Sequence, residues 1–196
     1  FVVGYVGTHG MAHGLSNVLD AAERLRDRPE ITFLLAGSGA ERAGLIADAR
    51  SRELSNVVFM EPQPKDKMPE VWSLCDVALV HLRDSPVFRD VIPSKIFEAM
   101  GMGLPILMAA PTGEASAILE SEGAGLCVAP EDPDALAEAV KLLHDDPAYR
   151  QTLAAHSLAA APDHSREHQA RHMISVLEAV VAGRGDSVGR IAPPSA

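Results

Sequence analysis

Five residues near the middle of this 196-residue chain have types and a spacing that suit the binding of a charged ligand. Asp90 and Glu98 are carboxylates eight positions apart, and Pro93, Ser94 and Lys95 lie between them. Pro93 presets φ and Ser94 can cap free backbone N–H groups, so we predict that a helix begins at about Ser94. Free N–H groups at a helix start, with a lysine beside them, suit an anion such as a phosphate.

The position of Lys95 in the first turn of this helix has two explanations. The helix dipole disfavours a cation at that end, so the lysine indicates a nearby anion. Alternatively, Lys95 and Glu98 form an ordinary i,i+3 pair on the surface. The helix is predicted to run to about Met102, because Gly101 and Gly103 then end it.

The stretch from Asp90 to Leu107 resembles the donor-site motif of retaining nucleotide-sugar glycosyltransferases of the GT-B fold, the group 1, family 4-like enzymes. The motif is an acidic residue, seven residues, a glutamate, a small-residue stop and a Gly-x-Pro strand entrance. Its internal Pro-Ser-Lys-Ile-Phe-Glu resembles the branch that builds bacterial surface polysaccharides, including lipopolysaccharide O-antigen and colanic acid.

The resemblance implies a role for each of these residues. Glu98 would hold the ribose hydroxyls of the nucleotide, and Asp90 would contact the donor sugar. Backbone amides from Pro93 through Ser94 to Lys95 would hold the diphosphate, and Lys95 would stabilise charge on the leaving group. The first acid in the family is usually Glu, so Asp90 departs from the pattern by one methylene. The resemblance implies a UDP-sugar as substrate, with no metal and no other cofactor required.

A glycine-rich loop after the first apolar run is a second candidate for phosphate binding. The candidate residues are Gly7, Thr8, His9, Gly10 and His13. Glycines let a phosphate approach the backbone, although this spacing is not the dinucleotide fingerprint. Most retaining relatives carry Arg and Lys where this chain has Thr8 and His13, whereas the polysaccharide branch has a similar Gly-Thr-His-Gly. Neutral His13 supplies no fixed charge near pH 7, so more of the phosphate contact would fall to Lys95. Alternatively, His9 and His13 are loop histidines that make ordinary hydrogen bonds.

Two further turns are candidates for nucleotide contacts. Gly37 and Ser38 form a tight turn after the second apolar run, and Gln63 follows the third. In the family, the first turn lies near the nucleotide and the second meets the base. The alternatives are a strand-to-helix connection that needs small residues and a solvated turn. An Asp-x-Asp sequence at Asp132 and Asp134 looks like the metal motif of another glycosyltransferase fold, but we interpret it as a helix cap with proline in the first turn.

Composition excludes other classes of function. The chain has 17 Lys and Arg against 27 Asp and Glu, a formal charge of −10, and no cluster of basic residues, so nucleic-acid binding is not expected. Cys75 and Cys127 are interpreted as reduced core residues of a cytoplasmic protein, without metal-ligand spacing. No apolar run approaches the roughly 18 residues that a membrane span requires.

The elements that must position these residues follow from the alternation of short apolar runs with amphipathic segments. We predict strands at 1–6, 31–36, 57–60, 77–82, 105–109 and 126–128, and helices at 15–26, 68–74, 147–160 and 166–182 among others. Right-handed crossovers then give an α/β, doubly wound, Rossmann-like domain with a six-stranded parallel sheet. Its ligands are expected beyond the carboxyl ends of the strands.

The resemblance also implies a domain organisation. Residues 1–182 would be the donor-binding, carboxy-terminal half of a GT-B enzyme, and 183–196 a disordered tail. The chain starts directly as a strand without an initiator Met, so an amino-terminal acceptor domain is expected to be absent from it. The last helix would cross to that domain and leave an apolar face exposed here. The domain alone would then bind nucleotide but turn over little.

The implied partners are a nucleotide-sugar donor, a lipid-linked or saccharide acceptor, and the chain's own amino-terminal domain. The resemblance also implies that the amino-terminal domain associates peripherally with the cytoplasmic face of the inner membrane.

Two other functions stay open at this point. A GT-B sugar-nucleotide epimerase would share the fold and the nucleotide site, and a non-enzymatic nucleotide-binding module would not depend on Glu98.

Overall fold

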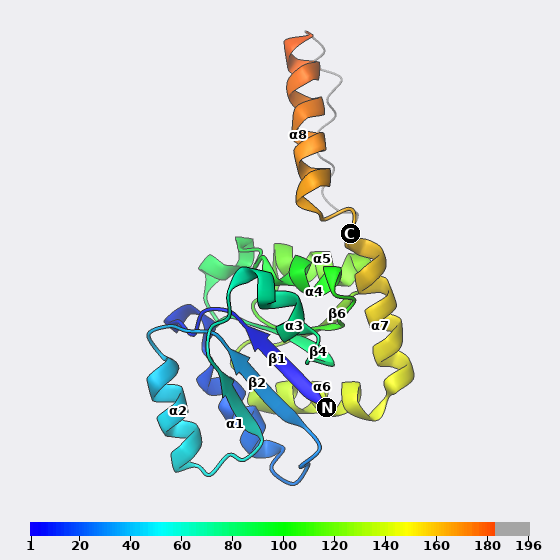
Figure 1. Cartoon of the computed structure of the whole chain (residues 1–196). Helices are drawn as coiled ribbons and strands as arrows, with labels where there is room; N and C mark the ends of the chain where they lie inside the picture. The colour runs from blue at the N-terminus through cyan, green and yellow to red at the C-terminus, as the bar shows by residue number, and fades with distance from the viewer. Residues whose placement is uncertain (183–196) are drawn as a thin grey trace.

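The computed structural model describes residues 1–182 as a parallel sheet between two layers of helices (Figure 1). The six strands are β1 (Val2–Val6), β2 (Thr32–Ala36), β3 (Val57–Met60), β4 (Val77–His81), β5 (Ile106–Ala109) and β6 (Gly125–Val128). Their order across the sheet is β3-β2-β1-β4-β5-β6, which confirms the predicted doubly wound, Rossmann-like fold. Residues 183–196, predicted to form a tail, lie outside the described residues.

The strands are apolar along their length because helices cover both faces of the sheet. One layer holds α1 (Ser16–Arg24), α2 (Arg42–Ser51) and α6 (Pro133–Asp145), and the other holds α3 (Met68–Trp72), α4 (Lys95–Gly101) and α5 (Glu114–Glu122) (Figure 1). Alternate residues point to opposite layers: Tyr5 packs into the first core and Val6 into the second. Helix α7 (Pro147–Ala160) passes from the first core at Leu153 to the second at Ala160.

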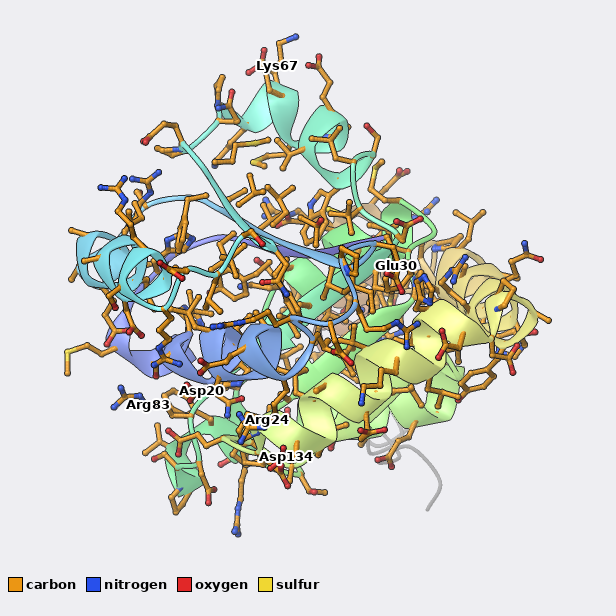
Figure 2. All side chains as sticks on the ribbon, turned by 90° about the horizontal axis from the view of Figure 1, so that it is seen from below. Asp20, Arg24, Glu30, Lys67, Arg83 and Asp134 are labelled. Carbon is orange, nitrogen blue, oxygen red and sulfur yellow. The ribbon has the colours of Figure 1, made fainter. Side chains whose placement is uncertain are left out.

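Helices α1 and α6 lie side by side, and polar contacts fix their ends. Arg24 forms an ion pair with Asp134 between them (Figure 2). Because Asp134 is largely exposed, this pair contributes little to stability. The Asp132 carboxylate accepts hydrogen bonds from the backbone N–H groups of Asp134 and Ala135, at 3.1 and 2.9 Å. The interpretation of this segment as a helix cap is therefore confirmed.

Two expectations from the sequence are wrong. Ser94 was expected to cap α4, but its own backbone is already helical, with φ −57° and ψ −25°, and its hydroxyl lies 3.5 Å from Glu98 Oε1. A capping side chain needs an extended backbone to reach back to the free N–H groups. Cys127 was expected in the core, but it is exposed because β6 is an edge strand. Cys75 is buried, as expected.

Helix α8 (Arg166–Val181) extends away from the body of the domain (Figure 1). Its apolar side chains are exposed, as expected for this helix: Met173, Ile174, Leu177, Val180 and Val181. Among the helices formed by residues 1–182, none has the length and apolar character needed to cross a membrane.

Candidate nucleotide site at the carboxyl edge of the sheet

Strands β1 and β4 are neighbours from which the chain winds in opposite directions across the sheet. In doubly wound folds, a crevice opens at the carboxyl ends of the strands where the winding direction changes. The glycine-rich loop follows β1 at this position, and the segment leading to Asp90 follows β4, with a short 3-10 turn, η3, at Pro86–Asp90. The fold therefore brings the two motifs to one edge.

The turns after β1 and β2 are in backbone contact. The N–H of Gly7 donates to Ala36 O at 2.9 Å, and the N–H of His9 donates to Ser38 O at 2.7 Å. Gly37 has φ +140°, and a Cβ there would lie only 1.9 Å from Gly7 O. Only glycine fits at position 37. Without a side chain there, the two turns can lie in direct contact, and their outer surface is not covered.

A hollow of about 180 Å³ lies on this surface and gathers residues from three predicted turns. Its lining includes Gly7, Thr8, Gly37, Ser38, Gln63 and Met68. A larger hollow of about 610 Å³ contains Ser94 and Glu98 of the acidic motif, and Met68 lines it too. The two hollows share Met68, so they adjoin each other at this residue.

Lys95 joins the two motifs. Its Nζ lies 3.7 Å from the centroid of the Tyr5 ring and directly beside Gly7, where a Cβ would be 3.1 Å from it. This Nζ is buried and has no hydrogen-bond partner among residues 1–182. Burial lowers the pKa of Lys95 to about 7, against the opposing effect of the Glu98 charge. The alternative of a surface pair between Lys95 and Glu98 is therefore wrong.

The two loop histidines are in different environments. His9 is fully buried, and within the described part of the chain neither of its ring nitrogens has a hydrogen-bond partner. Burial, followed by the charges of Arg42 and Lys95, lowers the pKa of His9 to about 4. His13 is half-buried, its Nδ1 is 3.3 Å from His81 O, and burial lowers its pKa as well. The alternative of an ordinary hydrogen bond thus describes His13, which contacts β4, but not the side chain of His9.

The sequence analysis missed the buried polar residues that support the loop. His81, at the end of β4, has Nδ1 2.6 Å from His13 O and Nε2 2.8 Å from the side-chain amide of Asn17. Burial lowers the pKa of His81 to about 4, so the ring is neutral at pH 7. The Tyr5 hydroxyl donates to Thr8 O at 2.7 Å. The sequence did contain one signal for these contacts: a histidine, His81, stands at the carboxyl end of an otherwise apolar run.

Asp90 is not brought together with the glycine turns or with Glu98 in either hollow. It is exposed at the end of η3 and lines neither of the two hollows described above. Its neighbour Arg89 lines a separate hollow of about 500 Å³ with Asp84 and Thr112. A Cβ at Gly113 would lie 2.0 Å from Arg89 O, so this segment is pressed against the start of α5.

Two other predicted site residues are placed as follows. Pro93 is half-buried, and Gly10 precedes the 3-10 turn η1 (Met11–His13).

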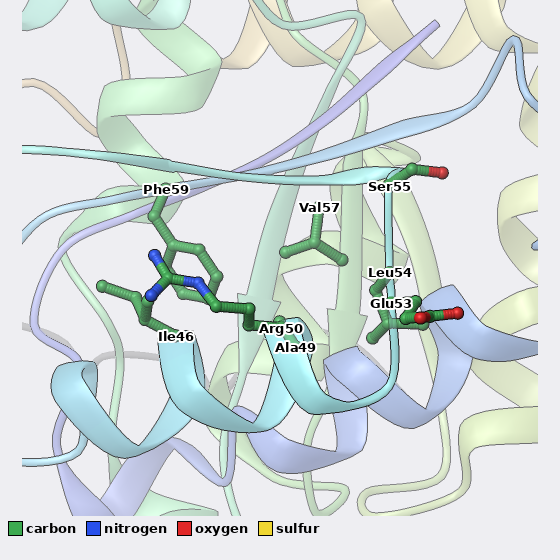
Figure 3. A pocket seen from close by; sticks show the side chains of 8 residues that line it. All are labelled: Ile46, Ala49, Arg50, Glu53, Leu54, Ser55, Val57 and Phe59. Carbon is green, nitrogen blue, oxygen red and sulfur yellow. The ribbon is translucent and has the colours of Figure 1, made fainter.

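A hollow of about 420 Å³ between α2 and β3 contains none of the predicted site residues (Figure 3). Its walls include Ile46, Val57 and Phe59, with Arg50 at one side. Residues 1–182 also contain no group of three His, Cys, Asp or Glu side chains arranged to hold a metal ion. The carboxyl edge of β1, β2 and β4 is therefore the best candidate site in the described structure.

Residues 1–158 match the model of the family described as glycosyl transferases group 1. The chain belongs to this family. Among curated group 1 relatives, WcaI of Escherichia coli K12, assigned to colanic acid biosynthesis as a glycosyl transferase, is 32% identical over 142 residues. The match covers 71% of this chain and 34% of that protein. A D-inositol 3-phosphate glycosyltransferase of Corynebacterium urealyticum is 26% identical over 91% of this chain and 43% of its own length.

Solved structures share the fold. Anabaena Alr3699/HepE in complex with UDP is 22% identical, with a TM-score of 0.79 over 93% of this chain and 49% of its own. Sucrose-phosphate synthase from Thermosynechococcus elongatus is 25% identical, with a TM-score of 0.78 over 93% of this chain and 46% of its own. This group 1 chain therefore spans less than half the length of these relatives.

Proposed function

We propose that this group 1 chain is the donor-binding domain of a retaining glycosyltransferase. The whole enzyme would move a sugar from a nucleoside diphosphate sugar to a lipid-linked or saccharide acceptor with the anomeric configuration kept. The observation that carries the proposal is the buried ammonium of Lys95, which lies beneath Gly7 without a hydrogen-bond partner among the described residues.

A buried cation without a partner is unfavourable unless an anion completes it. Gly7, which lies beside this ammonium, also lines the hollow with Thr8, Gly37 and Ser38. A diphosphate there would accept hydrogen bonds from main-chain N–H groups, including those near residues 93–95, and would lie against the Lys95 charge. During transfer, the same charge would stabilise the leaving diphosphate without a metal ion.

The rest of the nucleotide then extends along the two adjoining hollows. We assign the ribose hydroxyls to Glu98, whose carboxylate is exposed in the larger hollow, and the base to the turn with Gln63. Asp90 is assigned to the donor sugar. Its exposed position beyond β4 supports this role, because the sugar would extend from the diphosphate toward the acceptor.

The biological setting is proposed from the relatives. WcaI is assigned to colanic acid biosynthesis, and a structural neighbour, WaaG, is described as a glycosyltransferase of lipopolysaccharide biosynthesis. We therefore propose a role in bacterial surface polysaccharide synthesis, on the cytoplasmic side of the membrane. The UDP complexes of Alr3699/HepE support a UDP-sugar as donor. The free cysteines Cys75 and Cys127 are in keeping with a reducing compartment.

Calorimetric titration of the chain with UDP, GDP and ADP in the presence of EDTA tests the proposal. We expect one of the three to bind with one-to-one stoichiometry. Lys95→Met should weaken that binding by about 10- to 100-fold, because a hydrogen bond to a charged group contributes about 1.5–3 kcal/mol. Lys141→Met, on the surface of α6, is the matched control and should bind as wild type does. Binding by none of the three nucleotides would overturn the proposal.

A further inference from the structure

Tyr5 contacts both motifs of the candidate site: Lys95 of the acidic motif and Thr8 of the glycine-rich loop. The face of its ring lies 3.7 Å from Lys95 Nζ, and its hydroxyl donates to Thr8 O at 2.7 Å. The side chain is completely buried, so neither contact is replaced by water. We propose that Tyr5 is a positioning residue of the diphosphate site, which holds the Lys95 ammonium against Gly7 with its ring and the glycine-rich loop with its hydroxyl. This inference rests on the proposed function.

The ring is suited to this task because it offers the ammonium a negative face without neutralising it. A carboxylate in the same place would form an ion pair and compete with the incoming diphosphate. A cation over an aromatic face stays available as a hydrogen-bond donor on its other side. Burial raises the pKa of the Tyr5 hydroxyl, so Tyr5 stays neutral throughout the physiological range. The loop contact is therefore a neutral hydrogen bond at every working pH.

The charged and titratable groups around Lys95 come from several elements. Glu98 lies on its own helix, His9 and His13 lie in the loop after β1, and His81 ends β4. The pKa values of all three histidines are lowered, so they are neutral above pH 7, whereas the pKa of Lys95 is about 7. Lys95 is then the group in this set that changes charge between pH 7 and 9.

The burial of Lys95 gives the site a measurable pH dependence. A bound diphosphate favours the charged form of Lys95, so binding takes up a proton wherever the free protein has lost it. Affinity is therefore highest at and below pH 7 and falls as the pH rises. UDP is a suitable probe in this window, because a terminal phosphate loses its second proton near pH 6.

The test is a double-mutant cycle on UDP affinity at pH 7 and pH 9, with wild type, Tyr5→Leu, Lys95→Met and the double variant. Wild-type affinity should fall about tenfold or more between the two pH values. Tyr5→Leu should weaken UDP binding by at least about tenfold at pH 7, and its affinity should vary less with pH, because the ammonium can then move toward water. In the Lys95→Met background, Tyr5→Leu should change affinity by no more than about twofold.

The conservative variant Tyr5→Phe is the matched control. It keeps the ring and loses the bond to Thr8 O, so it should weaken UDP binding by about 2- to 10-fold at both pH values and keep the wild-type pH dependence. Failure of wild type to bind UDP, GDP or ADP would overturn both the proposed function and this inference, and the cycle uses whichever of the three binds. An equal loss from Tyr5→Leu in both backgrounds, with UDP bound by wild type, would overturn the role of Tyr5 alone.

A second measurement covers the case in which Tyr5→Leu does not fold. Lys95 Nζ lies 3.7 Å from the centroid of the Tyr5 ring, so the protons of the adjacent ε-methylene group should resonate upfield in the wild-type NMR spectrum. The proposal requires this upfield shift to persist when UDP is bound, because the ring holds the ammonium in the complex too. Loss of the shift on addition of UDP, or its absence in the free protein, would overturn the inference.

Discussion

Replacing Lys95 with methionine should stabilise the free protein. Methionine has a similar length and carries no charge, so it removes a buried ammonium that lacks a hydrogen-bond partner among residues 1–182. The pKa of Lys95 falls from 10.5 to about 7 on folding, chiefly through burial. Each tenfold change in proton affinity corresponds to about 1.4 kcal/mol, so burying the charge destabilises the fold by at most about 5 kcal/mol.

The Tyr5 ring reduces this amount, since a desolvated cation over an aromatic face gains about 2 kcal/mol. We therefore expect Lys95→Met to raise the free energy of unfolding by about 3 kcal/mol at pH 7. For a domain of this size, that corresponds to a rise in the melting temperature of roughly 6–12 °C. The same variant should lose affinity for UDP, so stability and binding would change in opposite directions.

The difference in stability between wild type and Lys95→Met should depend on pH. The folded-state pKa of Lys95 lies below its unfolded value, so the unfolded state binds the proton more tightly. Destabilisation by the charge is complete below about pH 7 and disappears as the pH rises toward 10.5. Melting curves of wild type and Lys95→Met between pH 6.5 and 10 should therefore converge at the alkaline end. A variant that is less stable than wild type at pH 7, or a constant difference at every pH, would refute the reasoning.

Three other substitutions test the framework of the site, each by thermal or urea unfolding. Gly37→Ala should destabilise the protein by about 2–5 kcal/mol, because its Cβ would lie 1.9 Å from a backbone oxygen at φ +140°, whereas Gly44→Ala in α2 meets open space and should stabilise by about 0.5–1 kcal/mol. Asn17→Ala removes the partner of His81 Nε2 and should cost about 1–3 kcal/mol; a change below 0.5 kcal/mol would show that the contact is not formed. Asp132→Ala removes the cap of α6 and should cost about 1 kcal/mol, with no effect on UDP binding.

The fold could be predicted because its signal is local. The run 105–109 is apolar throughout, as a strand covered on both faces must be, and the observed ends of the six strands lie within one residue of the predicted ones. The cap at Asp132 was also a local pattern, in which an acid precedes proline and an apolar helical segment. Such features depend on neighbours in the sequence and need no knowledge of distant contacts.

The burial of Lys95 could not be predicted from neighbouring residues in the sequence. Its burial results from the packing of α4 beneath a loop that follows β1, and the residues in contact, Tyr5 and Lys95, are 90 positions apart. The failed cap at Ser94 depends on one pair of backbone angles, which residue types do not determine. The support from His81 was missed because its partners, His13 and Asn17, are more than 60 positions away in the sequence.

The most direct test of the account is whether Glu98 holds the ribose of the bound nucleotide. Affinities of wild type and Glu98→Ala should be compared for UDP and for its 2′-deoxy and 3′-deoxy forms, with Glu120→Ala in α5 as the matched surface control. We expect Glu98→Ala to lose about tenfold or more in UDP affinity and no longer to distinguish UDP from the deoxy nucleotides. If Glu98→Ala keeps the wild-type preference for the intact ribose, Glu98 is not its ligand and the central claim is contradicted.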